Sequence, residues 1–398
     1  MKTTIATYLN GFDLDIRKSG NARFMDQKCT PDVICFIADC VLNAFGEGDE
    51  FTTADIWESQ YFAKNVLAIY NKPNADNPTA QHEYDKFIQQ PLKMLAYAHI
   101  LEETKVKGRN VFTLRNIELL EYIAQRERNT YVFLNSYLEK VLRDSNMWRY
   151  FEEYITKSTQ QNFTGVDFSE LKDRFTRFII GNTAINGKVE VYRIFPKILN
   201  IFAVEHHIKG SEKGRLSTYP FTFSDLMYNR KNWRDLNKDK SITRQEAEME
   251  AVDIEQQQAY NAYYVQKAIA LIRKIHSDSE VKDEWGNGEA TQVHHIFPKA
   301  QFPQIAHYVE NLIRLTPTQH FTKAHPSNNT KVVNSDYQLT CLLFKADSID
   351  KSLKRFGEKY YRKESFIYVI NLGLSQNIEV GLSLADIKTE LIRIYNAA

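Results

Sequence analysis

Histidines gather in one short part of this chain. Six of its ten histidines fall within about an eighth of its length, where even spacing would place one or two. Imidazoles are the commonest side-chain metal ligands and act as general bases near neutral pH. This density therefore predicts a site with metal-binding or proton-transfer chemistry. The six residues are His276, His294, His295, His307, His320 and His325.

The segment around the adjacent His294 and His295 has the pattern of a strand, a loop, a second strand and a helix. The run QVHHIFPK is rich in β-branched and aromatic residues and ends at a proline, and NLIRLT has the same character. Thr316 and Pro317 then begin a helix, because proline is favoured at the first helical position. Since side chains alternate along a strand, His294 and His295 are expected to point to opposite faces.

HHIFP, followed by NLIRLTP and QHFTKAHP, resembles the HNH or ββα-metal nuclease motif, in the His-His form of colicin-type nucleases. The resemblance implies that His295 is the general base that deprotonates the attacking water, and that His294 and His320 bind a metal. It also implies that the side-chain oxygen of Asn311 orients the imidazole of His295. One divalent ion per active site is expected: Mg²⁺, or, because the ligands are imidazoles, Zn²⁺, Ni²⁺, Co²⁺ or Mn²⁺.

His325 departs from the family pattern. Colicin-type members have a further ligand four residues after the helix histidine, whereas His325 follows His320 by five residues. In an α-helix this spacing rotates the side chain by about 500° instead of about 400°. His325 would miss the metal unless the helix unwinds before Pro326, so it is an open candidate ligand. For the whole cluster, the alternatives are a structural zinc site and an HNH fold kept only for binding.

Residues 20–118 have the outline of a winged helix. Helical patterns begin at Thr30 and near Thr52, and a third, HEYDKFIQQPLKMLAYAHIL, contains Pro91, which is expected to kink or divide it. LEETKVKGRNVFTLR then predicts a hairpin with a basic tip. In that architecture the third helix enters the DNA major groove and the hairpin contacts phosphates. The alternative is a small helical domain that serves protein contacts or acts as a scaffold. The expected DNA contacts are Lys93, Lys105, Lys107 and Arg109.

Residues 119–245 are expected to be mainly helical, with a basic and turn-rich second half. Glycine-separated lysines and arginines beside Trp233 suit contacts along a DNA backbone, and a solvated charged surface explains them equally well. The expected DNA contacts in this region are Lys213, Arg215, Arg230, Lys231 and Arg234.

DLNKDKSITRQE, residues 235–246, has oxygen-bearing side chains at the positions of an EF-hand calcium loop. Lys240 stands where that loop has a glycine, and Thr243 with Glu246 forms a capping box for a long helix that follows. The cap is the favoured interpretation. The alternative is a Ca²⁺ site formed by Asp235, Asn237, Asp239 and Glu246.

The expected fold is a predominantly helical α+β multidomain protein. The chain is 43% hydrophobic and 25% charged, as in ordinary globular proteins, and its four cysteines form no CxxC pair. It has neither a signal-peptide pattern nor the ~20-residue apolar run of a membrane helix, so we expect a cytoplasmic protein with no membrane partner. Residues 246–330 are expected to hold a long helix and the nuclease core, and residues 331–398 C-terminal helices for packing or self-association.

The part of the chain before the nuclease motif is larger than cleavage alone requires. Specific cutting needs ~1–3 kcal/mol of discrimination per base pair, gathered from several contacts. Including DQKCTPDV near its start, the chain resembles bacterial type II restriction endonucleases of the HNH class. The resemblance implies site-specific cleavage of double-stranded DNA by a homodimer with one active site per strand. The alternatives are a modification-dependent or less specific defence nuclease, and a DNA-binding regulator with an inert HNH fold.

Overall fold

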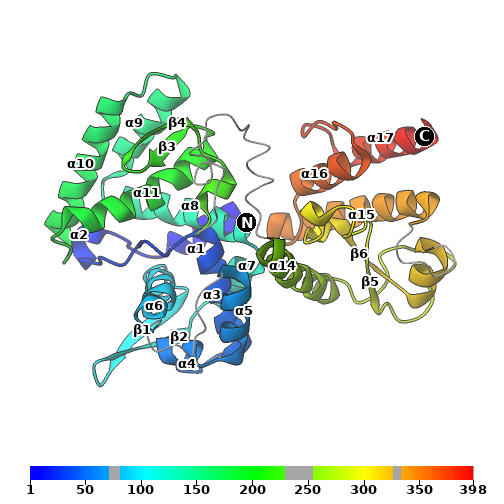
Figure 1. Cartoon of the computed structure of the whole chain (residues 1–398), viewed down its shortest axis with the longest axis horizontal. Coiled ribbons are helices and arrows are strands. Elements are labelled where there is room, and N and C mark those ends of the chain that lie inside the picture. The colour runs from blue at the N-terminus through cyan, green and yellow to red at the C-terminus, as the bar shows by residue number, and fades with distance from the viewer. Residues whose placement is uncertain (71–80, 229–253, 326–332, 398) are drawn as a thin grey trace. The chain divides into compact units, whose positions relative to one another are not determined.

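The computed structural model describes residues 1–70, 81–228, 254–325 and 333–397. The chain forms two compact units, residues 2–256 and residues 257–398 with Met1 (Figure 1). Helices predominate, and the strands of the described residues form three antiparallel pairs. The expected α+β, predominantly helical class is therefore confirmed. No helix in this described part combines the length and apolarity needed to cross a bilayer.

The first unit begins with helices around the buried helix α3. α3 follows Thr30, has Pro31 at its first position as predicted, and buries Cys35 and Cys40. The elements of this part are α1 (Lys2–Leu9), α2 (Ile16–Ser19), α3 (Pro31–Ala44), α4 (Thr53–Trp57), α5 (Gln60–Tyr70), α6 (Gln81–Tyr97), β1 (Leu101–Val106), β2 (Arg109–Leu114), α7 (Ile117–Gln125) and α8 (Glu127–Asp144).

The predicted hairpin is confirmed. β1 pairs with β2 in antiparallel register from Leu101 opposite Leu114 to Val106 opposite Arg109. Phe51, which lies between α3 and α4, forms an isolated antiparallel bridge with Phe112 on β2. α6 continues through Pro91, so of the two expected effects of this proline, a kink or a division, the division does not occur.

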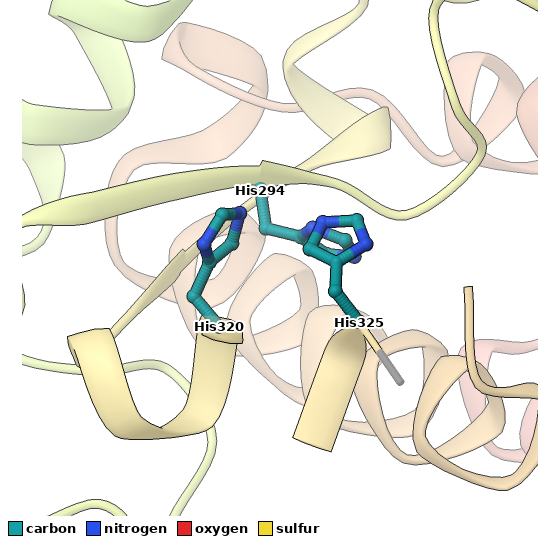
Figure 2. A group of neighbouring side chains, drawn as sticks. All are labelled: His294, His320 and His325. Carbon is teal, nitrogen blue, oxygen red and sulfur yellow. The ribbon is translucent and has the colours of Figure 1, made fainter. Parts of the chain in front are cut away.

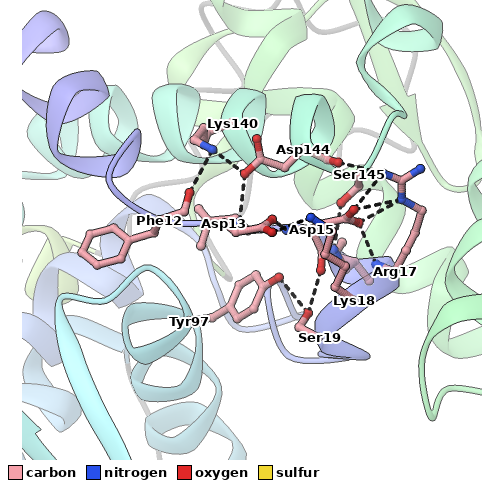
Figure 3. Close-up of polar contacts among 12 residues, drawn as sticks. Phe12, Asp13, Asp15, Arg17, Lys18, Ser19, Tyr97, Lys140, Asp144 and Ser145 are labelled. Carbon is pink, nitrogen blue, oxygen red and sulfur yellow. Dashed lines mark hydrogen bonds and ion pairs between the residues drawn. The ribbon is translucent and has the colours of Figure 1, made fainter.

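The chain between α1 and α2 is fixed to the end of α8 (Figure 3). The backbone N–H of Leu14 donates to Asp144 Oδ2 at 2.8 Å, and that of Ile16 donates to Ser145 Oγ at 3.0 Å. These bonds satisfy backbone groups in a segment without regular structure. Residues 2–19 thus belong to the fold of the first unit.

A second set of helices and a second hairpin complete the first unit. α11 packs against β3, and α10 packs against α11 and β4. The carboxamide of Asn200 on α11 donates to the carbonyl of Ser211 at 3.0 Å and accepts from its N–H at 2.7 Å, which fixes β3 to the helix. The elements are α9 (Trp148–Thr159), α10 (Gly165–Asn182), α11 (Lys188–Glu205), β3 (Lys209–Glu212), β4 (Arg215–Pro220) and the 3₁₀ helix η2 (Phe223–Leu226).

The second unit has one hydrophobic core, to which both the motif strands and the C-terminal helices contribute. Ile313 and Leu315 from β6 belong to the same cluster of buried side chains as Leu342, Ile370 and Leu391 from the last three helices. The elements are α14 (Ile254–Ile275), β5 (Gln292–His295), η3 (Pro303–Ile305), η4 (Val309–Asn311), β6 (Leu312–Leu315), η5 (Gln319–Ala324), α15 (Ser335–Phe356), η7 (Gly357–Lys359), α16 (Lys363–Leu374) and α17 (Leu384–Ala397).

A buried ion pair ties the segment before β5 to this core. Lys345 Nζ on α15 lies 2.7 Å from Glu280 Oε2, and both side chains are almost completely buried. The other carboxylate oxygen of Glu280 accepts from the backbone N–H of Arg314 on β6 at 2.9 Å. Because removing one partner would leave an uncompensated buried charge, this pair fixes β6 relative to α15.

Candidate metal centre

The β5–β6 pair presents the two adjacent histidines on opposite sides, as the strand pattern predicts. His294 lies opposite Ile313 and His295 lies opposite Leu312 in the antiparallel register. His294 is only 3% exposed. His295 is partly buried and turns toward the loop that joins the two strands.

The helix after β6 differs from the α-helix that the sequence predicts. Only Pro317 and Thr318 have the α-helical pattern, and residues Gln319–Ala324 form a π-helix. A π-helix has i→i+5 hydrogen bonds, so residues five apart lie near one another on one face. The five-residue spacing of His320 and His325, which would separate them in an α-helix, therefore brings them together here.

Three imidazoles converge from β5, from η5 and from His325, which follows η5 with an extended backbone (Figure 2). One ring nitrogen from each of His294, His320 and His325 lies within 4.8 Å of the others. The ring centroids are 5.3 Å apart for His294 and His320, 4.9 Å for His294 and His325, and 4.8 Å for His320 and His325. The structure thus places the two expected ligands together and adds the open candidate His325.

The chemistry of this cluster fits a divalent metal with nitrogen ligands. His294 Nε2 and His320 Nδ1 are buried, and neither makes a hydrogen bond with the described residues. Burial, and then the neighbouring histidines, hold the pKa of His294 well below its usual value. Burial and His325 lower the pKa of His320 to about 4. These imidazoles are thus kept neutral, the form that binds a metal.

His295 has a defined proton position. Its Nε2 lies 3.1 Å from the carbonyl oxygen of Ala306. A carbonyl can only accept, so Nε2 carries the proton and Nδ1 holds the lone pair. Burial lowers the pKa of His295 to about 4, and the hydrogen bond to Ala306 opposes that shift. Near neutral pH, His295 Nδ1 is therefore available to accept a proton.

Asn311 does not make the contact that was expected of it. Its Oδ1 accepts from the backbone N–H of Phe297 at 2.8 Å, and its Nδ2 donates to the carbonyls of Phe297 at 3.0 Å and Ile305 at 3.3 Å. The imidazole of His295 is instead oriented by the carbonyl of Ala306, next to Ile305. Asn311 is fully buried, and it orders the loop that carries this carbonyl.

Gln319 is a site residue that the sequence did not reveal. It is fully buried directly before His320, and its Oε1 accepts from Ser279 Oγ at 2.6 Å and from the N–H of Thr316 at 3.0 Å. Its Nε2 donates to Asp283 Oδ1 at 2.7 Å. These bonds fix the start of η5 to the segment before β5. A glutamine next to a histidine carries no signal of this role in sequence.

The expected DNA contacts divide into exposed and internal residues. Lys93 lies 3.5 Å from the carboxylate of Glu103 on β1, and both are about three-quarters buried. Lys93 thus has an internal partner that its expected role did not include. The exposed residues are Lys105, Lys107, Arg109, Lys213 and Arg215. Arg230, Lys231 and Arg234, and the calcium-loop residues Asp235, Asn237, Asp239 and Glu246, lie outside the described residues.

Comparisons of the chain with protein-family models, with curated proteins and with solved structures find no match. His294 on β5, His320 on η5 and His325 after η5 offer three imidazoles to a cation. The residue after His294 on the strand, His295, offers an imidazole with its proton fixed on one nitrogen.

Proposed function

We propose that this chain is a metal-dependent, site-specific endonuclease of the HNH type that hydrolyses double-stranded DNA. The observation that carries the proposal is the convergence of three imidazoles, in which buried nitrogens of His294 and His320 lack any hydrogen-bond partner among the described residues. A structural metal site would have no use for His295 beside it, with Nδ1 as its basic nitrogen. The order of these residues along the chain is that of the HNH motif.

Hydrolysis of a phosphodiester needs a proton acceptor for the attacking water and positive charge near the leaving oxygen. A divalent ion, when bound by the three imidazoles, supplies that charge. His295 Nδ1 takes the proton from water, and the carbonyl of Ala306 stabilises the imidazolium that forms, because it accepts from Nε2–H. Such general-base catalysis typically contributes ~10²–10⁴ in rate.

Cutting a duplex requires action on both strands. One group of three potential ligands is found among the described residues, so each chain offers one cutting centre. A homodimer with one centre per strand meets this need, and a symmetric dimer matches a palindromic site. The basic tips of the first unit, with Lys107 and Lys213 exposed, suit contacts with phosphates.

The test is digestion of methylated and unmethylated plasmid DNA by the full-length protein, with and without added divalent metal. We expect discrete fragments only with metal. His295→Ala should lose cleavage by a factor of about 10² or more while it still binds DNA and metal. The matched control is His206→Ala, which removes an exposed histidine of the first unit.

Other results of this digestion would change or refute the proposal. Cleavage confined to modified DNA would replace the proposal with a modification-dependent nuclease. An unspecific smear would remove site specificity from it. Normal cutting by His295→Ala would refute the role of this histidine, and an absence of cleavage with every metal would refute the proposed activity.

A further inference from the structure

The first unit contains the same arrangement of helix and hairpin twice (Figure 1). α6 and α11 each contain an internal proline, Pro91 and Pro196, and each is followed by an antiparallel hairpin. The turns that end these helices also match. His99 and His207 have positive φ values of 59° and 53°. Left-handed residues also end α8, α9 and α16, so the likeness of the two parts lies in the order of proline-containing helix, cap and hairpin.

Both helices end in the same kind of cap, which also ends α8, α9 and α16. The N–H of Ile100, which follows His99, donates to the carbonyl of Leu95 at 2.9 Å. The N–H of Ile208, which follows the second left-handed histidine, donates to the carbonyl of Ala203 at 2.9 Å. Both are bonds across five residues, as in a Schellman motif. The same cap therefore directs the chain from each helix into its hairpin.

The hairpin tips are alike in sequence and conformation. Lys107 and Gly108 have φ values of 48° and 82°, and Lys213 and Gly214 have 47° and 79°. Two successive positive φ values define a type I′ turn, for which asparagine and glycine are the favoured residues. A lysine in this conformation costs on the order of 1 kcal/mol. Each tip thus holds an exposed lysine at a strained position, followed by glycine and arginine.

The two helices differ in what they expose. Gln90 on α6 is buried and accepts from the N–H of Lys28 at 2.9 Å. The first two turns of α11, by contrast, expose Lys188, Val189, Tyr192 and Arg193. Their spacing of one, four and five residues from the first places them on one face of the helix. These residues give the first two turns of α11 an exposed cationic and aromatic face, as a reading helix requires.

Lys172 on α10 connects this face with the second hairpin tip. Its Nζ lies 4.9 Å from the ring centre of Tyr192 and donates to the carbonyl of Gly214 at 3.0 Å. We define the α11 surface as Lys188, Tyr192, Arg193, Lys213 and Arg215. Its four cations form no ion pair with the described residues, so their charge is available to a partner.

We infer that the α11 surface is the main DNA-reading surface of the chain, with α11 in the major groove and Lys213 and Arg215 at a flanking phosphate. This inference rests on the proposed function, since it assumes a duplex DNA substrate. The major groove admits an α-helix, and arginine, an aromatic ring and a branched apolar side chain can contact base edges there. A hairpin tip beside such a helix reaches the backbone.

The test is duplex DNA binding by full-length protein without divalent metal, measured by fluorescence anisotropy at several salt concentrations. Lys188→Ala with Arg193→Ala should weaken binding at least tenfold and reduce the salt slope by ~0.9 for each phosphate that is no longer neutralised. Lys64→Ala with Lys86→Ala removes the same charge from exposed positions on α5 and α6 and should change the affinity less than threefold. Thermal unfolding should be the same for both double variants.

Arg193→Lys separates base reading from charge. It should keep most affinity for unspecific duplex but lose cleavage at the preferred site, because lysine lacks the bidentate geometry of arginine. If the α11 double variant binds and cuts like the control, this inference fails and the nuclease proposal stands. If the wild-type protein binds no duplex at any salt concentration, both fail.

Discussion

A buried carboxamide holds the loop that orients His295. Asn311 closes three hydrogen bonds, two to the backbone of Phe297 and one to the carbonyl of Ile305. The next carbonyl, that of Ala306, accepts from His295 Nε2. Asn311 thus positions His295, the proposed base, through the loop, and its removal should affect stability and catalysis together.

We expect Asn311→Ala to destabilise the protein by ~1–3 kcal/mol, because buried backbone groups lose their partners. Cleavage should slow by a smaller factor than in His295→Ala, and metal affinity should change little. Chemical denaturation and single-turnover cleavage measure the two effects. Asn287→Ala, at an exposed position, is the control. Full activity with unchanged stability would contradict the role of Asn311.

At the residue scale, the sequence predicted which histidines lie together better than it predicted the hydrogen-bond partners of the site residues. The strand pattern and the resemblance placed His294 and His320 together, and the structure does so. The expected contact between the side-chain oxygen of Asn311 and His295 was wrong, because this oxygen accepts from the N–H of Phe297 instead. Which donor lies near a side-chain oxygen depends on the path of the whole loop. Gln319 was missed for the same reason, since its partner Ser279 is distant in sequence.

The π-helix η5 decides which histidines face the centre. Helical patterns in sequence are judged by the α-helical repeat, so five-residue spacing placed His325 off the metal-binding face. η5 ends at Ala324, and its wider turn brings the extended residue His325 back to the side of His320. The third imidazole of the cluster therefore depends on the type of helix, which a residue pattern does not reveal.

Single-residue changes in η5 test this dependence. Deletion of Thr322, which is exposed, shortens the spacing of the two histidines from five residues to four, and an α-helix then places both on one face. We expect this variant to keep metal binding. Insertion of alanine after Thr322 gives a spacing of six, which fits neither helix, and should weaken metal binding by at least tenfold. Equal metal affinities in both variants would contradict the assignment of His325 as a ligand.

The tip of the first hairpin, between β1 and β2, is expected to contact DNA phosphates. Lys107→Ala with Arg109→Ala should reduce the slope of log affinity for DNA against log salt by about 1.8, if each residue neutralises one phosphate. The double variant Lys64→Ala with Lys86→Ala again serves as the charge-matched control. Anisotropy titrations measure both slopes. An unchanged slope in the hairpin variant would show that this tip does not touch DNA.

The sequence predicted the first hairpin and missed the second. The first has six-residue strands, and before its turn Thr104 and Val106 alternate with charged residues. β3 has only four residues, with Gly210 and Ser211 among them, and its register is interrupted by a bulge. Glycine and serine have low strand propensity, so the segment gave only a turn signal. Its pairing is set by contacts with α11, such as those of Asn200.

At the scale of the whole molecule, the motif strands and the last helices are one unit. Residues 246–330 and 331–398 were expected as separate regions, but β6, α15, α16 and α17 contribute to one core. An amphipathic helix shows in its sequence that one face is buried, yet it does not show against what. The sequence left open whether the C-terminal helices pack within the chain or self-associate. In the structure they pack within the chain, against the motif strands.

The proposed activity requires a divalent cation bound by three imidazoles in the second unit. Titration of metal-free protein with Co²⁺, followed by visible absorption, measures that binding without DNA or catalysis. We expect one saturable site in the wild-type protein and in His206→Ala, and loss of this site in His294→Ala with His320→Ala. Saturable binding that persists unchanged in the double variant, or no binding in the wild-type protein, would contradict the account.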